Sequence, residues 1–239
     1  MKIFVDEKSI ESGVILGENA HYISKVLRVK IGDKIILGGE NLAEHYVEIC
    51  EITKNEVRFD VLKSCKNENE PGREIVLFQC LPKGDKFDDV IKKSVELGVF
   101  EVVPVLSGRC VSRPNVQSAV KKVARWNAIS KNAAQQSRRG VVPKVREITG
   151  FNEAIEQMKV MDLSIVFYES GGENIKQILN NSVKSIAILI GPEGGFSADE
   201  IEMAKSAGVN VASLGKRILR CETAPIAALS IICHEIGEM

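Results

Sequence analysis

Two glycine-containing segments in the C-terminal third of the chain have residue types from which a ligand site can be built. The first, Gly191-Pro-Glu-Gly-Gly195, follows the apolar run Ile186–Ile190 directly and precedes Ser197. Adjacent glycines let a ligand approach the backbone closely, and Pro192 stiffens the turn. The second, Ser213–Pro225, places three cations and one carboxylate among apolar residues. Such a composition favours a polar ligand over a plain connection.

A third glycine-containing segment, Glu169-Ser-Gly-Gly172, follows the apolar run Leu163–Tyr168. All three segments therefore come directly after a predicted strand. Open α/β sheets bind their ligands at the carboxyl ends of strands. We expect the three segments to converge on one pocket.

The usual nucleotide and hydrolase fingerprints are absent. No G-x-G-x-x-G or G-x-S-x-G is found, and Gly215-Lys216 is followed by Arg217 rather than by Ser or Thr. An ordinary Rossmann fingerprint is therefore missing, and a kinase or NTPase is disfavoured. The six cysteines form no C-x-x-C pair and the three histidines lie far apart, so we predict free thiols packed as small hydrophobes and no metal site.

The first 65 residues have the pattern of short strands. Strands are expected at 2–5, 33–37, 45–53 and 56–62, with one helix at about 18–29. This succession predicts a small β-barrel. The polar stretch Lys66–Arg73 then contains Pro and Gly and is the best candidate for a linker.

Strands and helices alternate after this stretch. Strands are expected at 74–81, 99–105, 163–168, 185–190 and 210–214, and helices at 86–97, 114–137, from the capping box Ser197-Ala-Asp-Glu200 to Gly208, and from about Thr223 to Glu235. The alternation predicts an α/β fold with a mostly parallel sheet and helices on both faces. The expected domains are 1–70 and 74–239.

The charge of the chain is balanced overall but locally segregated. Thirty-two basic residues match 32 acidic ones, yet the segment Arg109–Arg146 has ten basic residues and no acidic one. Like charges repel, so this block needs an anionic neighbour, either a polyanion such as nucleic acid or acidic residues elsewhere in the fold. Trp126 within it could stack on a base, but a core position is favoured. No apolar window or N-terminal leader suggests a membrane segment, which predicts a cytoplasmic protein.

Ile190-Gly-Pro-Glu-Gly-Gly-Phe-Ser197 together with Leu214-Gly-Lys-Arg-Ile-Leu-Arg-Cys-Glu-Thr-Ala224 resembles the signature of the RsmE family. These are 16S ribosomal RNA (uracil-N3)-methyltransferases of the SPOUT superfamily. Further matches are His21–Arg28, Lys83–Lys86, Glu96–Gly98 and Arg125–Arg138, so the resemblance extends over the whole chain. The chain departs from the family pattern at Lys2, Asn132 and Gln135.

The resemblance implies methyl transfer from S-adenosylmethionine to N3 of a specific uridine in the small ribosomal subunit. It also implies an N-terminal PUA-like RNA-binding domain, a deep trefoil knot in the SPOUT-type C-terminal domain, and a homodimer with no metal and no membrane partner. The cofactor-binding residues expected from the matched loops are Tyr168, Glu169, Ile190, Gly191, Pro192, Gly195, Leu214, Gly215, Ile218 and Leu219.

Uracil N3 must lose a proton, and a cation can stabilise the developing anion. Arg220 is the candidate for this catalytic role because it lies in a cofactor loop and stays charged. Glu222 is either a catalytic base or the ion-pair partner of Arg217 or Arg220. Glu193 is expected to fix its own loop or to contact a neighbouring subunit.

The basic block and the matched motifs predict RNA contacts for Arg28, Lys83, Lys86, Arg109, Arg113, Arg125, Arg138 and Arg139. Two alternatives stay open. One is a SPOUT methyltransferase that acts on tRNA or on a ribose 2′-OH, and the other is a non-catalytic RNA-binding module that retains the pocket.

Overall fold

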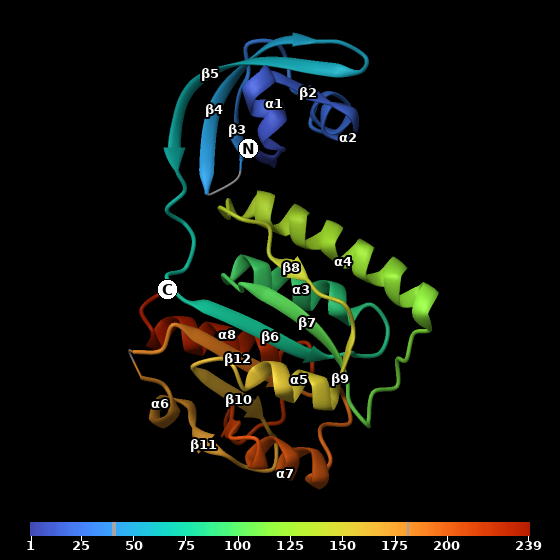
Figure 1. Ribbon diagram of the computed structural model, residues 1–239, viewed down its shortest axis with the longest axis vertical. Coiled ribbons are helices and arrows are strands. Elements are labelled where there is room, and N and C mark those ends of the chain that lie inside the picture. The colour runs from blue at the N-terminus through green and yellow to red at the C-terminus, as the bar shows by residue number, and fades with distance from the viewer. Residues whose placement is uncertain (40–41, 181) are drawn as a thin grey trace. The chain divides into compact units, whose positions relative to one another are not determined.

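The computed structural model describes residues 1–39, 42–180 and 182–239, and its elements are labelled in Figure 1. They form two compact units. The first comprises Met1–Glu70 with Ala134–Val142, and the second comprises Pro71–Ala133 with Pro143–Met239. The chain thus leaves the first unit after Glu70, inside the polar stretch 66–73, and a later segment rejoins it. The sequence pattern does not reveal this return, since it places 134–142 in the second domain.

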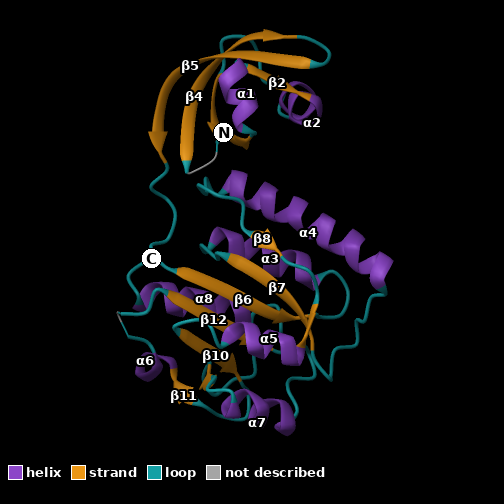
Figure 2. Cartoon of the chain, viewed as in Figure 1, coloured by secondary structure: helices purple, strands orange, loops and turns teal. Residues whose placement is uncertain are grey.

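The first unit contains a five-stranded sheet in the order β1-β3-β4-β5-β2. Its strands are β1 Lys2–Phe4, β2 Val14–Leu16, β3 Lys34–Gly38, β4 Ala43–Ile52 and β5 Glu56–Lys66. Strand β1 is parallel to β3, and the remaining pairings are antiparallel. Strands β4 and β5 are long and bent (Figure 2). Among the described residues, β1 and β2 are the edges of this order, so the ladder pairings do not close it into a barrel.

Two short elements of this unit are not predicted. Helix α1 (Glu7–Ser12) is capped by the Asp6 side chain, which accepts from the Ser9 N–H at 2.8 Å, and it ends at Gly13. Strand β2 follows it. The predicted helix at 18–29 is shorter, with α2 at Gly17–His21 continuing into a π-helical turn at Tyr22–Val26. Alternation places Val47 and Ile49 of β4 and Val57 and Phe59 of β5 in a single core with Ile3, Ile15, Ile23 and Leu37. Val61 and Leu62, further along β5, are exposed.

A buried charge network holds residues 134–142 in the first unit. Lys2 is 2% exposed, and its Nζ lies 2.9 Å from Oε1 of Glu44 and 2.6 Å from the carbonyl oxygen of Arg139. The Glu70 carboxylate accepts from Nε and Nη2 of Arg139 at 2.8 and 2.7 Å, and from the Gly140 N–H at 2.6 Å. Every one of these charges has a counter-charge, as burial requires.

The polar stretch 66–73 is anchored at both ends, each within its own unit. Asn67 is buried and donates to Glu44 at 2.7 Å. Beyond the boundary, the Gly72 N–H donates to Glu238 at 3.0 Å, and Arg73 Nε donates to the Val183 carbonyl at 3.0 Å. The expected linker is therefore fixed by hydrogen bonds.

The second unit is built on a parallel sheet in the order β11-β13-β10-β12-β6-β7-β8, with β9 also pairing to β7. The strands are β6 Glu74–Cys80, β7 Glu101–Leu106, β8 Lys144–Val145, β9 Thr149–Gly150, β10 Leu163–Phe167, β11 Glu173–Asn174, β12 Ser185–Ile190 and β13 Asn210–Ser213. Successive side chains of a strand point to opposite faces. Because β6, β10 and β12 are buried almost without interruption, both faces of the sheet are covered.

The helices of this unit are α3 Lys86–Glu96, α4 Val116–Gln136, α5 Phe151–Met158, α6 Ile175–Ile178, α7 Ala198–Ser206 and α8 Ala224–Glu235. The capping box at Ser197 is confirmed, since Ser197 Oγ accepts from the Glu200 N–H at 3.2 Å and Glu200 Oε2 accepts from the Ser197 N–H at 2.8 Å. Helices α5 and α6 and the two-residue strands are not predicted. No helix in the described ranges is long and apolar enough to cross a membrane.

Candidate functional site

The three glycine-containing loops converge on one pocket. Strands β13, β10 and β12 are neighbours and parallel, so the loops that follow them leave the same edge of the sheet. The pocket between them has a volume of about 350 Å³. All ten residues predicted to bind the cofactor line it, and its further lining residues are Lys86, Phe167, Glu193, Ser213, Arg217, Arg220, Cys221 and Ala224.

Gly195 is the glycine whose absent side chain matters most for the shape of this pocket. Its φ is +63°, a conformation that L side chains rarely adopt. A Cβ atom there would overlap Oε1 of Glu169, which comes from the loop after β10. Glycine at this position therefore lets the Glu169 carboxylate lie against the loop after β12.

Lys86, the first residue of α3, joins two carboxylates at the pocket. Its Nζ lies 3.3 Å from Oε1 of Glu193 and 3.2 Å from Oε2 of Glu222. Glu193 also accepts from the Lys83 backbone N–H at 3.1 Å, and Glu222 accepts from Cys221 Sγ at 3.2 Å. Glu222 therefore pairs with Lys86, and the expected ion pair with Arg217 or Arg220 is wrong.

These contacts shift the pKa of each group in the cluster. Burial opposes ionisation of Glu193 and Glu222, but hydrogen bonds from backbone N–H groups, Lys86 and Cys221 outweigh it and lower both pKa values. The hydrogen bond to Glu222 raises the pKa of Lys86, and burial with the same carboxylate raises the pKa of Cys221 to about 12. Glu222 is consequently ionised at neutral pH and is a weak base, which disfavours its catalytic-base role.

Arg220 has a different environment from Lys86. It lines the pocket and is exposed, and no carboxylate among the described residues forms an ion pair with it. Glu222 lies two residues away but is not among the residues that line the pocket. A guanidinium that faces a pocket without a counter-charge can stabilise negative charge on a bound ligand.

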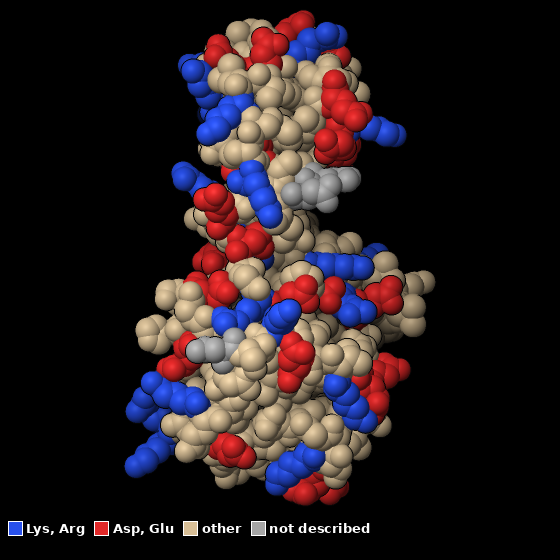
Figure 3. All heavy atoms as spheres, turned by 60° about the vertical axis from the view of Figure 1, so that its left-hand side comes forward, with Lys and Arg blue, Asp and Glu red and all other residues tan. Residues whose placement is uncertain are grey.

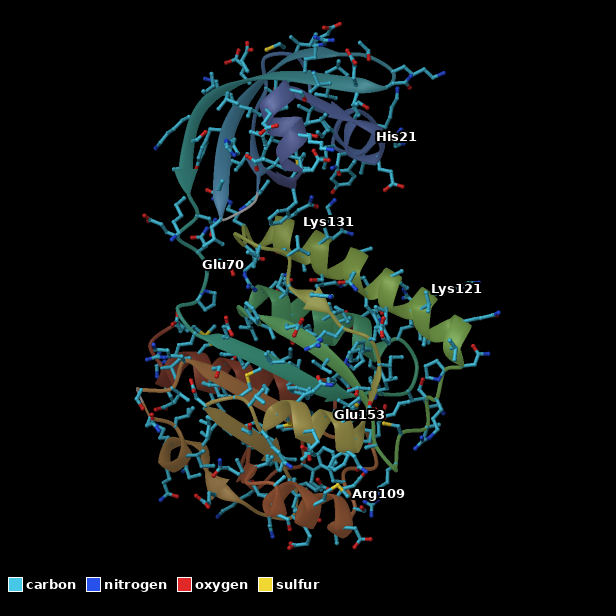
Figure 4. All side chains as sticks on the ribbon, viewed as in Figure 1. His21, Glu70, Arg109, Lys121, Lys131 and Glu153 are labelled. Carbon is cyan, nitrogen blue, oxygen red and sulfur yellow. The ribbon has the colours of Figure 1, made fainter. Side chains whose placement is uncertain are left out.

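Two arginines predicted to contact RNA hold loop carbonyls, one in the pocket loop after β12 and one in the loop after β7. Arg109 Nη1 donates to the carbonyl of Gly194 at 2.8 Å, and Arg113 Nη2 donates to the carbonyl of Ser107 at 2.7 Å. Figure 4 shows Arg109 in the lower part of the second unit. Both side chains are exposed, so these contacts leave their remaining N–H groups accessible to solvent.

The basic block is partly neutralised by acidic residues of the fold. Arg139 is 3% exposed and bound to Glu70, so the prediction that it contacts RNA is contradicted by its burial. Arg125 pairs with Asp85 and Asp88, and Arg146 pairs with Glu101. Basic and acidic side chains are interspersed on the face of the molecule that Figure 3 draws.

Further basic residues of the block lie on α4. Among them are Lys121 and Lys131 (Figure 4), of which Lys121 is exposed and Lys131 is half-buried. Arg28 and Arg138 are exposed with φ values of 53° and 58°. Trp126 is 3% exposed and packs on Phe87 with ring centroids 4.4 Å apart, which confirms its core position.

Sequence reasoning assigned Lys83 and Lys86 to RNA binding and missed the place of Lys86 in the pocket wall. Strand β6 lies beside β12, and α3 begins shortly after β6, which brings Lys86 to the loop after β12. Knowledge of this strand order would have placed Lys86 at the site. In the described residues, no group of three His, Cys, Asp or Glu side chains could hold a metal ion.

Comparison with known proteins agrees with this geometry. A family model described as an RNA methyltransferase domain matches residues 68–233. Ribosomal RNA small subunit methyltransferase E of Bacillus subtilis is 34% identical over 92% of this chain and 89% of its own length. The enzyme of the same name from Mesomycoplasma hyopneumoniae is 32% identical over 96% and 97%. The crystal structure of the Neisseria gonorrhoeae enzyme of that name, bound to S-adenosyl methionine, covers 98% of this chain and 96% of its own, with a TM-score of 0.88 and 32% identity.

Proposed function

The chain belongs to the RNA methyltransferase family that includes ribosomal RNA small subunit methyltransferase E, and from this premise we propose that it methylates N3 of one specific uridine in 16S ribosomal RNA. It is an S-adenosylmethionine-dependent rRNA methyltransferase. The observation that carries the proposal is the single pocket at which all three glycine-containing loops meet. The position of the methyl group on the base and the identity of the uridine are the parts proposed here.

The pocket fits the cofactor in size and chemistry. Its volume of about 350 Å³ is typical of a small-molecule site, and its lining combines apolar residues and glycines with a few charged residues. Ile190, Leu214 and Leu219 offer apolar surface to an adenine ring, while backbone groups of the three loops offer donors and acceptors to ribose and the amino-acid part. When bound, S-adenosylmethionine supplies a methyl group that is already activated on a sulfonium.

The residues of the chain then supply orientation and electrostatics. Uracil N3 is a poor nucleophile until it loses its proton, and the resulting charge spreads onto the two carbonyl oxygens O2 and O4. The guanidinium of Arg220 lines the pocket and can donate to such an oxygen, so it stabilises the anion as it forms. The base in the target RNA must first leave its stack to enter the pocket.

The finer architecture is also part of the proposal. We assign the second unit to the SPOUT class with a deep trefoil knot, and the first unit to a PUA-like RNA-binding domain. We further propose a cytoplasmic homodimer with the site beside the interface. Support comes from the parallel sheet with the pocket loops at its edge, and from the similarity to the relatives over nearly the whole chain. Sedimentation equilibrium tests the dimer.

The decisive experiment is nucleoside mass mapping of small-subunit rRNA from a strain that lacks this gene. Loss of one 3-methyluridine, restored by the purified protein with S-adenosylmethionine, is the expected result. A missing ribose-methylated nucleoside in this rRNA, or unchanged rRNA together with a nucleoside missing from the tRNA of the same strain, would instead support the other SPOUT reactions. Cofactor binding without transfer to any RNA would identify a non-catalytic module.

A further inference from the structure

We propose that Lys86 is a positioning residue for methyl transfer, which binds the Glu193 and Glu222 carboxylates and so keeps Arg220 as an unpaired cation facing the substrate. The inference rests on the proposed function. It assigns a role to a side chain that does not itself need to touch the reacting atoms.

Lys86 connects three segments around the pocket through one ammonium group. It begins α3, while Glu193 lies in the loop after β12 and Glu222 in the loop after β13. Its Nζ is within 3.3 Å of both carboxylates, and it lines the pocket itself. Its side chain is 36% exposed, so the pair is partly shielded from water. Removing Lys86 would break both ion pairs at once.

Both carboxylates are held in place by a second donor in addition to Lys86. The Lys83 N–H fixes Glu193 at 3.1 Å, and Cys221 Sγ fixes Glu222 at 3.2 Å. Loss of the ammonium would therefore leave two uncompensated negative charges, Glu193 in the pocket wall and Glu222 next to the lining residue Cys221. Each of them would oppose the negative charge that develops on uracil.

Glu222 is also the nearest carboxylate to Arg220 in the sequence, two residues away in the same loop. Arg220 has no ion-pair partner among the described residues, whereas Glu222 is bound by Lys86. Without Lys86, Glu222 would become the natural partner of the guanidinium. An arginine paired in this way would give less stabilisation to a substrate anion, because its charge would already be compensated.

The test compares Lys86→Met with Lys86→Arg and with the double variant Lys86→Met/Glu222→Gln. Lys86→Met should lower the single-turnover rate about 100-fold with cofactor and RNA saturating, the loss typical of one electrostatic contact. The dissociation constant for S-adenosylmethionine, measured by calorimetry, should change less than about threefold. Lys86→Arg should keep most of the rate, because it retains the charge.

The double variant distinguishes two roles of Lys86, which are compensation of the Glu222 charge and direct contact with the substrate. If Lys86 acts by compensating the charge of Glu222, the double variant should transfer methyl groups at least about tenfold faster than Lys86→Met. A double variant as slow as Lys86→Met would overturn the proposal. The matched control is Lys92→Met, which removes a lysine of the same helix whose Nζ lies 3.3 Å from Asp89 and which should leave the rate unchanged.

A second variant keeps the test independent of how Lys86→Met folds. For Lys86→Ala, added propylammonium should restore part of the rate and propanol should not, and equal effects of the two would overturn the proposal. Wild-type protein that transfers no methyl group to rRNA would overturn the proposed function, and this inference with it. An active wild type with an undiminished Lys86→Met rate would overturn this inference alone.

Discussion

Arg220 and Lys86 both line the pocket, yet the charges around them give them different tasks. Lys86 lies between two carboxylates, and Arg220 has no carboxylate partner in the described parts of the chain. Lys86, whose charge is already compensated, is suited to hold the wall of the pocket in place. Arg220, whose charge is not compensated, is suited to stabilise negative charge on the substrate, and this contrast leads to the first prediction.

Arg220→Ala should lower the rate of methyl transfer about 100- to 1000-fold, or about 3–4 kcal/mol, while cofactor affinity changes little. The reason is that uracil gains negative charge only on the way to the transition state. Raising the pH should recover part of the rate, since more uracil is then already ionised at N3. Single-turnover rates across the pH range, at saturating cofactor, measure this.

Arg220→Lys serves as the control and should restore only part of the rate, because a point charge lacks the planar donor fork. A contrary outcome would be weakened cofactor binding or a lower melting temperature, with no recovery at high pH. Arg220 would then shape its loop rather than act on the substrate.

Lys2 and Glu44 form a buried pair, and removing one charge should be worse than removing both. Glu44→Gln leaves the Lys2 ammonium, which is 2% exposed, without its counter-ion and should cost about 3–5 kcal/mol. Lys2→Met/Glu44→Gln should recover much of this loss. Denaturant unfolding of the three proteins measures the difference, and a double variant less stable than the single one would contradict it.

Glu44 should also make the folding stability of the protein decrease at acidic pH. Burial opposes its ionisation, but hydrogen bonds from Lys2 and Asn67 lower the pKa of Glu44 below its usual value of 4.5. A lowered pKa in the folded state stabilises the protein above pH 4.5, and this contribution is lost as the pH falls through the folded-state value. The stability of Glu44→Gln should therefore fall less between pH 5 and pH 3 than that of wild type.

At the scale of elements, the helix after the pocket loop depends on its cap. Ser197 and Glu200 satisfy each other's backbone N–H groups at the start of α7, directly after Gly195 and Phe196. Ser197→Ala should destabilise the protein by about 1 kcal/mol. Thermal unfolding measures this loss, and Ser206→Ala at the other end of the helix is the control. Equal melting temperatures for the two variants would contradict the prediction.

Strands were predictable where an apolar run alone decides them. Ser185–Ile190 is buried in the sheet at the residues expected, and β6 and β10 agree within one residue at each end. The order of the strands was not predictable, because apolar runs look alike and nothing local says which two are neighbours. Lys86 was therefore assigned to RNA and not to the pocket wall. Helix α1 escaped prediction because six residues show too little periodicity.

The candidate site, too, has a part that could be predicted from the sequence and a part that could not. The ten residues predicted to bind the cofactor line one pocket, and this grouping was accessible from the sequence because they lie in three loops whose glycines are visible in it. The partner of Glu222 was not accessible, because Lys86 lies more than 130 positions away and meets it only in the fold. The opposite charges within its own loop suggested Arg217 or Arg220 as the ion-pair partner of Glu222 instead.

At the scale of the whole molecule, RNA affinity should depend on the exposed part of the basic block. Lys121→Ala/Arg138→Ala removes two exposed cations, whereas Arg139 is buried against Glu70. The slope of log affinity against log salt should become shallower by about 0.7–0.9 for each phosphate that the variant no longer neutralises. Fluorescence anisotropy with an rRNA fragment measures this slope.

Lys205→Ala, outside the block on α7, is the control and should keep the wild-type slope. An unchanged slope for Lys121→Ala/Arg138→Ala would mean that these two cations do not meet phosphate. Arg139→Ala should behave differently, with a loss of folding stability as its main effect, because it leaves Glu70 without its partner.

The discontinuous first unit has a consequence for biosynthesis. Translation proceeds from the N-terminus, so Lys2, Glu44 and Glu70 leave the ribosome long before Arg139 has been made. At about 5–20 residues per second, the nascent chain needs several more seconds to reach Val142. During that interval Glu70 has no guanidinium partner and Lys2 lacks one of its two acceptors. An rRNA methyltransferase of this design completes its own N-terminal unit only after more than half of its chain has been synthesised.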